Sequence, residues 1–264
     1  MNIMLIGGGG REHAILRSLK KNPAVETVWM LPGNGAMESE AVCTGISATD
    51  LDAIVAFAKE HPVDYAVVAP DDPLVLGCVD RLNELNIPCF GPKANAAIIE
   101  GSKAFSKNLM KKYRIPTAEY EIFDDMDKAI AYLQTKEMPI VVKADGLALG
   151  KGVIIAETLA DAEDAVRSMM ADKVFGASGD HVVIEEFLTG PEVSVLAFTD
   201  GKTLVPMVSS MDHKRALDND EGLNTGGMGT VAPNPYYTAD VAEVCMQTIF
   251  LPTMAAMNAE GRTT

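Results

Sequence analysis

The sequence predicts an α/β protein with an N-terminal, doubly wound parallel sheet followed by an incomplete α+β domain. Over the first part of the chain, short apolar segments alternate with segments of helical period, which is the pattern of a parallel sheet with helices on both faces. After about Lys93, strand-like segments follow one another more closely, which favours antiparallel pairing. The chain ends at Gly-Arg-Thr-Thr without a strand that would close this second part. We therefore expect one domain at 1–100 and an incomplete one at 101–264.

The first domain contains short apolar strands separated by amphipathic helices. The strands are expected at Asn2–Ile6, Val25–Leu31, Tyr65–Ala69 and Pro88–Gly91, and the helices at Arg11–Lys21, Leu51–Glu60 and Leu74–Leu85. Asp50 stands where its carboxylate can cap the second helix. Three turns, Gly7–Glu12, Pro32–Asn34 and Pro70–Pro73, follow strands, and ligands of such sheets bind beyond the carboxyl ends of the strands.

The second domain mixes helices with strands. We expect helices at Ala94–Glu100, Ser102–Tyr113, Asp127–Thr135, Leu159–Met170 and Thr238–Met257, and strands at Ala118–Phe123, His181–Phe187, Glu192–Thr199 and Thr203–Met211. Residues 212–235 are rich in Gly, Asn and Asp, and we expect a long loop there. A loop of this length in a compact domain is usually functional.

Composition narrows the function classes. The chain has 264 residues, 48% of them hydrophobic, and a formal charge of 22 − 37 = −15. Such a charge argues against nucleic acid and anionic membranes as partners. The four cysteines show no C-x-x-C pattern, which favours free thiols over metal or redox use. Because no long apolar run occurs, we expect a soluble, cytoplasmic protein.

The segment 139–155 predicts a glycine-rich hairpin between two apolar strands. Gly146, Gly150 and Gly152 allow tight turning and close approach of backbone amides to a ligand. Lys143 and Lys151 could add charge-assisted hydrogen bonds to a polyphosphate. The segment is not a Walker A loop, since it lacks that motif and leads into a strand. An ordinary hairpin with solvated lysines is the alternative.

The glycine run Gly7–Gly10 invites a dinucleotide interpretation, which fails in detail. Glu12 and His13 stand where the third glycine or alanine is required, and Pro32-Gly33 stands where an acidic residue should meet the ribose. Amides at the start of a helix still suit a phosphate, and Arg11 adds a fixed charge. A tight turn without a ligand is the alternative.

Two further segments carry candidate chemistry. In Val182–Glu192 a strand end beside Phe187 and Leu188 could hold an adenine ring, and Glu192 could accept hydrogen bonds from ribose hydroxyls. Together with Lys103, Lys143 and the glycine hairpin, this segment predicts a nucleotide triphosphate site without Walker geometry. The alternatives are a solvated acidic turn and a surface lysine.

In the polar segment 211–229, Asp212 could bind a substrate ammonium group, and Lys214 and Arg215 a carboxylate or phosphate. For His213 we weigh a general-base role against one in orientation or structure.

Taken together, these motifs resemble one family. The chain contains, in order, G-G-G-G-R-E-H-A, P-G-N, F-G-P, E-G-S-K-A-F, V-V-K-A-D-G-L-A-L-G-K-G-V, V-I-E-E-F-L-T-G-P-E-V-S, D-H-K-R-A-L-D and N-T-G-G-M-G. This set resembles the glycinamide ribonucleotide synthetases (phosphoribosylamine–glycine ligases), an ATP-grasp family of purine synthesis. The resemblance implies a pre-ATP-grasp domain, then an incomplete ATP-grasp domain whose nucleotide-lid subdomain covers about 116–188.

The resemblance also implies a reaction. ATP, with Mg2+ or Mn2+, phosphorylates glycine, and the amine of 5-phosphoribosylamine attacks the glycyl phosphate to give glycinamide ribonucleotide, ADP and phosphate. The catalytic residues implied are Lys143, Asp212 and Lys214. The nucleotide-binding residues implied are Lys103, Lys143, Gly150, Lys151, Gly152, Glu185, Glu186, Phe187, Leu188 and Glu192. The substrate-binding residues implied are Gly8, Gly9, Gly10, Arg11, Asn34, Asp71, Asp212, Lys214, Asn224, Thr225, Gly226 and Gly227.

The chain departs from the family pattern at three places. Asp71 stands where the family usually has Glu, and Met211 replaces a common polar residue. The family's metal ligands, an acidic residue and an Asn on a late strand, have no counterpart before Thr264. We therefore expect this polypeptide to bind nucleotide weakly and to turn over poorly or not at all.

Two other functions remain open: another ATP-grasp carboxylate–amine ligase, such as one that handles aminoimidazole ribonucleotide, and a non-catalytic nucleotide-binding module. We expect a monomer or weak homo-oligomer.

Overall fold

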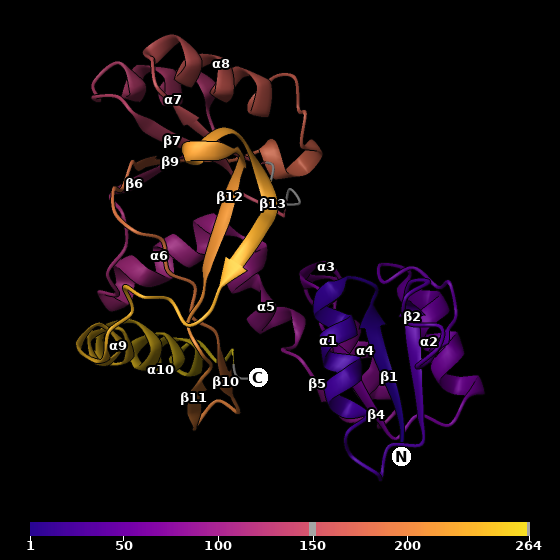
Figure 1. The fold of residues 1–264 in the computed structure, drawn as a ribbon. Helices are drawn as coiled ribbons and strands as arrows, with labels where there is room; N and C mark the ends of the chain where they lie inside the picture. Colours follow the sequence, from indigo (N-terminus) through magenta and orange to yellow (C-terminus); the bar gives the residue numbers. More distant parts are fainter. Residues whose placement is uncertain (148–151, 263–264) are drawn as a thin grey trace. The chain divides into compact units, whose positions relative to one another are not determined.

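The computed structural model describes residues 1–147 and 152–262, which divide into two compact units. The N-terminal unit is Met1–Gly101, and the C-terminal unit begins at Ser102. Figure 1 shows both units as ribbons coloured along the sequence. Each unit has its own sheet.

The N-terminal unit is a five-stranded parallel sheet in the order β3-β2-β1-β4-β5. Its strands are β1 (Asn2–Gly7), β2 (Thr27–Pro32), β3 (Val42–Cys43), β4 (Tyr65–Val68) and β5 (Cys89–Phe90). Its helices are α1 (Gly10–Leu19), α2 (Leu51–Glu60), α3 (Asp71–Val75), α4 (Cys78–Glu84) and α5 (Ala94–Gly101). The predicted parallel α/β architecture is confirmed, and the short strand β3 is an addition to it.

Alternating side chains of β1 build two cores in this unit. Ile3 and Leu5 pack with Leu16 of α1 on one face of the sheet, while Met4 and Ile6 pack with residues of α2 and α4 on the other. Since successive side chains of a strand point to opposite faces, an apolar strand requires cover on both faces. The doubly wound arrangement follows from this requirement.

The predicted helix Leu74–Leu85 is wrong as one element, because the structure has two helices there. Gly77 lies between α3 and α4 with φ of +89°, a left-handed conformation that breaks a helix and that glycine adopts without steric cost. The first helix starts earlier than expected, at Asp71. Pro73 is tolerated in its first turn because an amide donor is not required there.

The C-terminal unit is built on a four-stranded antiparallel sheet in the order β6-β9-β7-β8. Its strands are β6 (Tyr120–Phe123), β7 (Ile140–Ala144), β8 (Val153–Ala156) and β9 (Val182–Glu186). Helices α7 (Met126–Leu133) and α8 (Leu159–Met170) bury one face of this sheet through residues such as Leu133 and Met169. The predicted glycine hairpin is confirmed as β7 and β8, which pair antiparallel.

The remaining elements of this unit are α6 (Lys103–Tyr113), the pair β10 (Ala197–Thr199) and β11 (Leu204–Pro206), the hairpin β12 (Met211–Leu217) and β13 (Glu221–Val231), and a C-terminal helical segment. Short 3-10 turns lie at Gly176–Gly179 and Asp218–Asp220. The predicted strands Glu192–Thr199 and Thr203–Met211 are shorter than expected. Their pairing is extended by the Ser194–Ser210 bridge and by the hydrogen bond from the amide of Met207 to the carbonyl of Leu196.

The loop predicted at 212–235 is wrong. Residues up to Val231 form the antiparallel β12–β13 hairpin, with register shifts after His213 and Arg215. Most side chains of β12 are exposed, so neither face shows the apolar alternation by which a strand is recognised. Its backbone hydrogen bonds, rather than a buried face, define this element.

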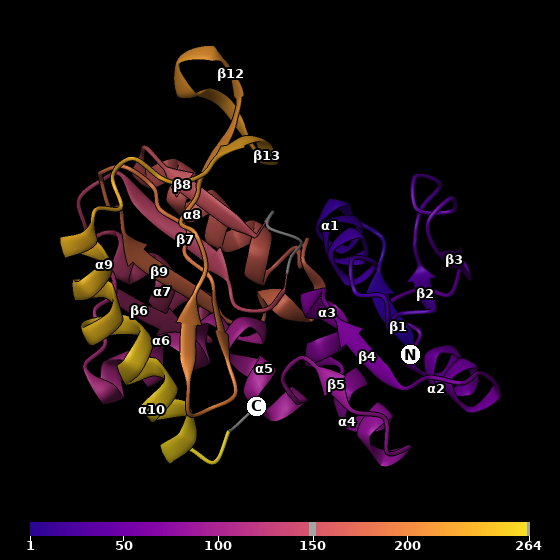
Figure 2. The same cartoon turned by 60° about the horizontal axis from the view of Figure 1, so that its bottom comes forward.

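The helix predicted at Thr238–Met257 is confirmed with an irregularity. It consists of α9 (Ala239–Cys245), a π-helical turn at Met246–Phe250, and α10 (Leu251–Ala259), which Figure 2 shows as one continuous rod. Pro252 lies two residues after the end of this turn. Because proline has no amide hydrogen and its ring crowds the carbonyl four residues earlier, the helix widens locally.

Within the described residues, no helix has the length and apolar character needed to cross a lipid bilayer.

Burial makes Cys78 an unreactive thiol. Its side chain is 1% exposed on α4, and this burial raises its pKa to about 12. Cys43 is half-buried by comparison. Since the thiolate is the reactive species, we expect iodoacetamide at pH 8 to alkylate Cys43 at least about tenfold faster than Cys78. Peptide mass spectrometry measures both rates, and labelling in denaturant is the control; equal rates in the folded protein would contradict this assignment.

Candidate functional site

The predicted phosphate turns of the N-terminal unit meet at the carboxyl ends of β1 and β4. A cavity of about 290 Å³ lies there. It is lined by Gly9, Gly10, Arg11, Glu12, Pro70, Asp71 and Asp72. Of the predicted substrate residues, the structure thus brings Gly9, Gly10, Arg11 and Asp71 to one cavity.

Gly8 and Asn34 lie beside each other at the ends of β1 and β2. Asn34 Nδ2 donates to the carbonyl of Gly8 at 2.7 Å. A Cβ atom at position 8 would lie 2.6 Å from the carbonyl oxygen of Gly33, so glycine is required by the close approach of the two turns. This contact holds the Pro-Gly-Asn turn against the glycine run.

Glu12 changes the interpretation of the glycine run. Its side chain is 5% exposed, and its Oε2 accepts a hydrogen bond from the amide of Gly9 at 2.6 Å. The Gly9 amide is therefore already satisfied by the protein, so it is not one of the amides that this turn offers to a phosphate. Arg11 Nη1 donates to the carbonyl of Ala69 at 3.4 Å, so the cation of this turn also contacts the end of β4.

In the C-terminal unit, β7, β9 and α6 place two lysines on one carboxylate and a third lysine on the backbone after β7. Lys143 Nζ lies 2.9 Å from Oε2 of Glu185, and Lys107 Nζ lies 3.1 Å from the same oxygen. The Glu185 and Lys107 side chains are buried, whereas that of Lys143 is 26% exposed. Lys103 Nζ donates to the carbonyl of Gly146 at 2.9 Å. The arrangement holds more positive than negative charge beside the glycine hairpin.

Sequence reasoning missed Lys107, although a signal was present. Lys107 stands four residues after Lys103, so the two side chains share one face of α6. A lysine on a buried helix face requires a carboxylate partner, and Glu185 was already a candidate.

The start of the glycine hairpin is hydrogen-bonded to the N-terminus of α6. Asp145 Oδ1 accepts from the amide of Ala104 at 2.7 Å and from the hydroxyl of Ser102 at 3.1 Å. Ser102 in turn caps the helix through the amide of Phe105. Asp145 was another residue that sequence reasoning missed, and it fixes Lys103 beside the backbone that follows β7.

The predicted adenine segment follows the end of β9. Glu186 Oε1 accepts a hydrogen bond from the amide of Glu119 at 2.9 Å, so this carboxylate is bonded to the backbone just before β6. The side chains of Phe187 and Leu188 are 38% and 64% exposed. Two apolar side chains left exposed at a strand end are suited to contact a planar apolar ring.

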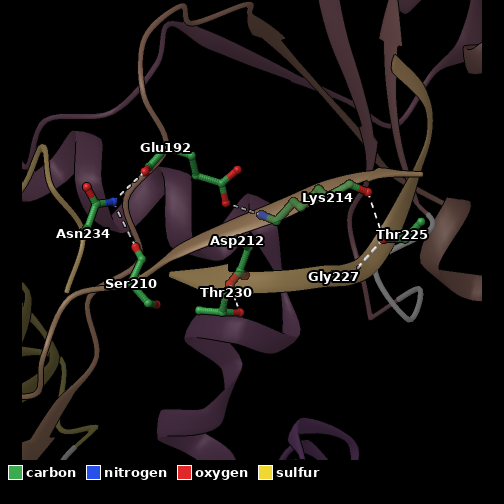
Figure 3. Close-up of polar contacts among 8 residues, drawn as sticks. All are labelled: Glu192, Ser210, Asp212, Lys214, Thr225, Gly227, Thr230 and Asn234. Atoms are coloured by element: carbon green, nitrogen blue, oxygen red, sulfur yellow. Dashed lines mark hydrogen bonds and ion pairs between the residues drawn. The ribbon is translucent and has the colours of Figure 1, made fainter. Parts of the chain in front are cut away.

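A polar network joins Glu192 to the β12–β13 hairpin, and Figure 3 shows its side chains. The ammonium group of Lys214 forms an ion pair with Glu192. Thr225 Oγ1 donates to the carbonyl of Lys214 at 2.9 Å and accepts from the amide of Gly227 at 3.1 Å. Thr230 Oγ1 donates to Asp212 Oδ1 at 3.0 Å. The predicted residues Asp212, Lys214, Thr225 and Gly227 therefore share one hairpin.

Asn234 anchors this network and was not predicted. Its side chain is buried, and its Nδ2 donates to the carbonyls of Glu192 at 2.8 Å and Ser210 at 3.1 Å. Its Oδ1 accepts from the amide of Tyr236 at 2.8 Å. These bonds hold the segment that carries Glu192 against the base of the hairpin.

We expect Asn234→Ala to destabilise the C-terminal unit by about 2 to 3 kcal/mol, because three part-buried hydrogen bonds to backbone groups are lost. Chemical denaturation measures the change. Gln134→Ala, at an exposed position of the same unit, is the control and is expected to change stability by less than about 0.5 kcal/mol. Equal effects of the two variants would contradict the anchoring role.

Some predicted residues are not fully described. Gly150 and Lys151 lie outside the described residues, and for Asn224 and Gly226 only the backbone of β13 is described. The carbonyl of Gly152 accepts from the amide of Ala144 at 2.9 Å, beside the hairpin pairing. Across the described part of the chain, no group of three or more His, Cys, Asp or Glu side chains could hold a metal ion.

Comparisons with known proteins match both units. Residues 1–100 match the family described as phosphoribosylglycinamide synthetase, N domain, and residues 101–263 match phosphoribosylglycinamide synthetase, ATP-grasp (A) domain.

Individual relatives agree with the family match. The chain is 49% identical over 263 residues to a phosphoribosylamine–glycine ligase of Haemophilus influenzae, covering 99% of this chain and 61% of that protein. It is 48% identical over 265 residues to the ligase of the same name from Escherichia coli K12, covering 100% of this chain and 62% of that one. A crystal structure of phosphoribosylamine–glycine ligase from Thermotoga maritima matches with a TM-score of 0.86 and 30% identity, over 100% of this chain and 63% of that chain.

The chain thus spans about 61% of the length of these curated relatives. Since the family matches account for both units and follow the order of the motifs, the chain belongs to the phosphoribosylglycinamide synthetase family and carries its N domain and its ATP-grasp domain.

Proposed function

We propose that the protein to which this chain belongs ligates glycine to 5-phosphoribosylamine with ATP, in purine synthesis. The products are glycinamide ribonucleotide, ADP and phosphate. The observation that carries the proposal is the lysine-rich cluster of Lys143, Glu185 and Lys107 beside the glycine hairpin, in a chain that carries both domains of the family.

The chemistry requires activation of glycine. A carboxylate is a poor acyl donor because its oxygen does not leave, so ATP first transfers its terminal phosphoryl group to that oxygen. The amine of phosphoribosylamine then attacks the carbonyl carbon, and phosphate departs. The protein must therefore hold the transferring phosphoryl group among cations and hold both substrates in line.

The C-terminal unit offers the groups that a nucleotide requires. Lys143 and Lys103 would contact phosphate oxygens, as would the loop with Gly150, Lys151 and Gly152. The segment Glu185–Leu188 would hold adenine, with Phe187 and Leu188 against the ring, and Glu192 would accept from the ribose. The partly exposed Lys143 ammonium and the exposed apolar pair support this assignment.

The N-terminal unit would hold phosphoribosylamine. Gly8–Arg11 and Asn34 would surround the phosphate end, and Asp71 would accept from ribose hydroxyls. The cavity of about 290 Å³ that Arg11 and Asp71 line supports the assignment. Since Asp is shorter than Glu by one methylene, the ribose would lie closer to the start of α3 than in relatives that have Glu.

The β12–β13 hairpin would hold glycine and its acyl phosphate. Asp212 would accept from the glycine ammonium group, and Lys214 with residues 224–227 would contact the carboxylate or phosphate. Lys214 is paired with Glu192, and Asp212 accepts from Thr230. Substrate binding would therefore exchange these contacts for contacts to glycine.

Further parts of the proposal rest on the family. Mg2+ or Mn2+ would neutralise charge on the phosphates, while Lys143 and Lys103 are the cations that this chain itself supplies. We propose a cytoplasmic protein, monomeric or weakly self-associating, that acts on small molecules and binds neither nucleic acid nor membrane.

The test is ADP formation by the protein to which this chain belongs, measured with a panel of carboxylic acids and amines. The proposal expects ADP only when glycine and phosphoribosylamine are both present. ADP formation with aminoimidazole ribonucleotide would instead indicate another ATP-grasp ligase. ATP binding without any turnover on the panel would favour a nucleotide-binding module.

A further inference from the structure

The ammonium group of Lys107 is fully engaged by the protein. Its side chain is 8% exposed, and its Nζ lies 2.7 Å from Thr117 Oγ1, 3.1 Å from Glu185 Oε2 and 3.5 Å from the carbonyl of Ala118. A lysine ammonium has three donors, and these three acceptors account for them. The group also lies 5.3 Å from the centre of the Tyr120 ring. Lys107 is therefore placed to act on Glu185 rather than on a ligand.

Glu185 connects Lys107 to Lys143. Both ammonium groups meet the same carboxylate oxygen, at 3.1 and 2.9 Å. One carboxylate between two lysines leaves the cluster with one positive charge in excess. Because Glu185 and Lys107 are buried and Lys143 is 26% exposed, the excess charge is available at Lys143.

We propose that Lys107 is a positioning residue, which offsets the charge of Glu185 so that the ammonium group of Lys143 attracts a nucleotide phosphate. The inference rests on the proposed binding of ATP by the C-terminal unit. Without Lys107, the buried carboxylate would neutralise Lys143 and would itself repel phosphate oxygens, since charges interact strongly at short range away from bulk water. Lys107 would then set the affinity for phosphate without touching it.

A merely structural role, in which Lys107 only ties α6 to β9, makes a different prediction. Structural damage would weaken every part of the nucleotide site alike, whereas a change in charge would affect phosphates alone. The experiment therefore compares ATP with adenosine, which lacks phosphates. Isothermal titration calorimetry of the 264-residue chain gives both dissociation constants.

The variants are Lys107→Gln, Glu185→Gln and the double variant. Glutamine at position 107 removes the charge and keeps N–H donors for Thr117. We expect Lys107→Gln to weaken ATP binding about tenfold, the size of one charge-assisted hydrogen bond, and to change adenosine binding by less than about twofold. In the double variant the unbalanced carboxylate is gone, so we expect ATP affinity to return to within about threefold of the unchanged chain.

Lys111→Gln is the matched control, because Lys111 is exposed on the same helix and also lies near the Tyr120 ring, at 5.8 Å. It is expected to alter neither constant. Thermal unfolding confirms that each variant is folded.

Three results would each overturn the inference. Lys107→Gln could lose ATP and adenosine affinity equally, it could lose neither, or the double variant could bind ATP as weakly as Lys107→Gln. If the unchanged chain binds ATP no more tightly than adenosine, the proposed function itself fails, and the inference fails with it.

Discussion

Replacing Glu185 by alanine is expected to destabilise the C-terminal unit by about 4 kcal/mol, a large part of a domain's stability. The substitution leaves the buried ammonium group of Lys107 without its counter-charge, and it removes the partner of Lys143. An uncompensated buried charge costs several kcal/mol, whereas the intact pair contributes little net stability. Urea denaturation followed by circular dichroism measures the change.

The control for this variant is Glu121→Ala, because Glu121 is an exposed glutamate on the neighbouring strand β6. It is expected to change stability by less than about 0.5 kcal/mol. A second variant, Lys107→Met with Glu185→Met, removes both charges and is expected to recover most of the lost stability. A small effect of Glu185→Ala would show that water reaches Lys107 and that the cluster is not buried in solution.

Replacing Lys143 by methionine is expected to weaken ATP binding by about 2 kcal/mol, roughly thirtyfold in Kd, through loss of a charge-assisted hydrogen bond to phosphate. Methionine keeps the apolar stem and removes the charge. Adenosine affinity is expected to stay within about twofold, since adenosine has no phosphate for Lys143 to meet. Calorimetric titration of both ligands gives the comparison.

Lys59→Met serves as the control, because Lys59 is exposed near the end of α2 in the N-terminal unit. It is expected to leave ATP affinity unchanged. A Lys143 variant that binds ATP as tightly as the unchanged chain would remove Lys143 from the nucleotide site.

The elements that bury apolar faces could be predicted from the sequence. β1, β4, β7 and β9 each present side chains to a core, and their sequences show continuous apolar runs. Helices with a clear cap, such as α2 after Asp50, also begin where the sequence indicates. In these segments the same cause, burial of apolar side chains, produces the hydrophobic pattern of the sequence and stabilises the observed element.

The β12–β13 hairpin could not be predicted in this way. Its strands expose most of their side chains and carry glycines and charged residues. The sequence there shows no alternation of apolar and polar residues from which the pairing of the two strands could be predicted. The glycine hairpin was predictable because apolar strands flank its loop on both sides.

For the candidate sites, the sequence indicated the residues that we propose to bind a ligand, and it missed residues that hold them in place. Lys107, Asp145 and Asn234 act through contacts with distant parts of the chain: Glu185, the start of α6, and the segment around Glu192. Such contacts depend on tertiary structure, and spacing along the chain does not reveal them. Glu12 is a further example, because the sequence did not reveal that its carboxylate accepts a hydrogen bond from the Gly9 amide.

The central claim is that each unit holds its own ligand: ATP on β7, β9 and the following segment, and a phosphorylated ribose at the turns after β1, β2 and β4. Hydrogen exchange of the 264-residue chain, measured by mass spectrometry with ATP and Mg2+ or with ribose 5-phosphate, tests it most directly. We predict that ATP slows exchange in peptides covering 140–147 and 182–188, and that ribose 5-phosphate slows exchange in peptides covering 7–12, 33–36 and 69–72. Unchanged exchange in 140–147 and 182–188 at saturating ATP, or protection of the same peptides by both ligands, would contradict the account.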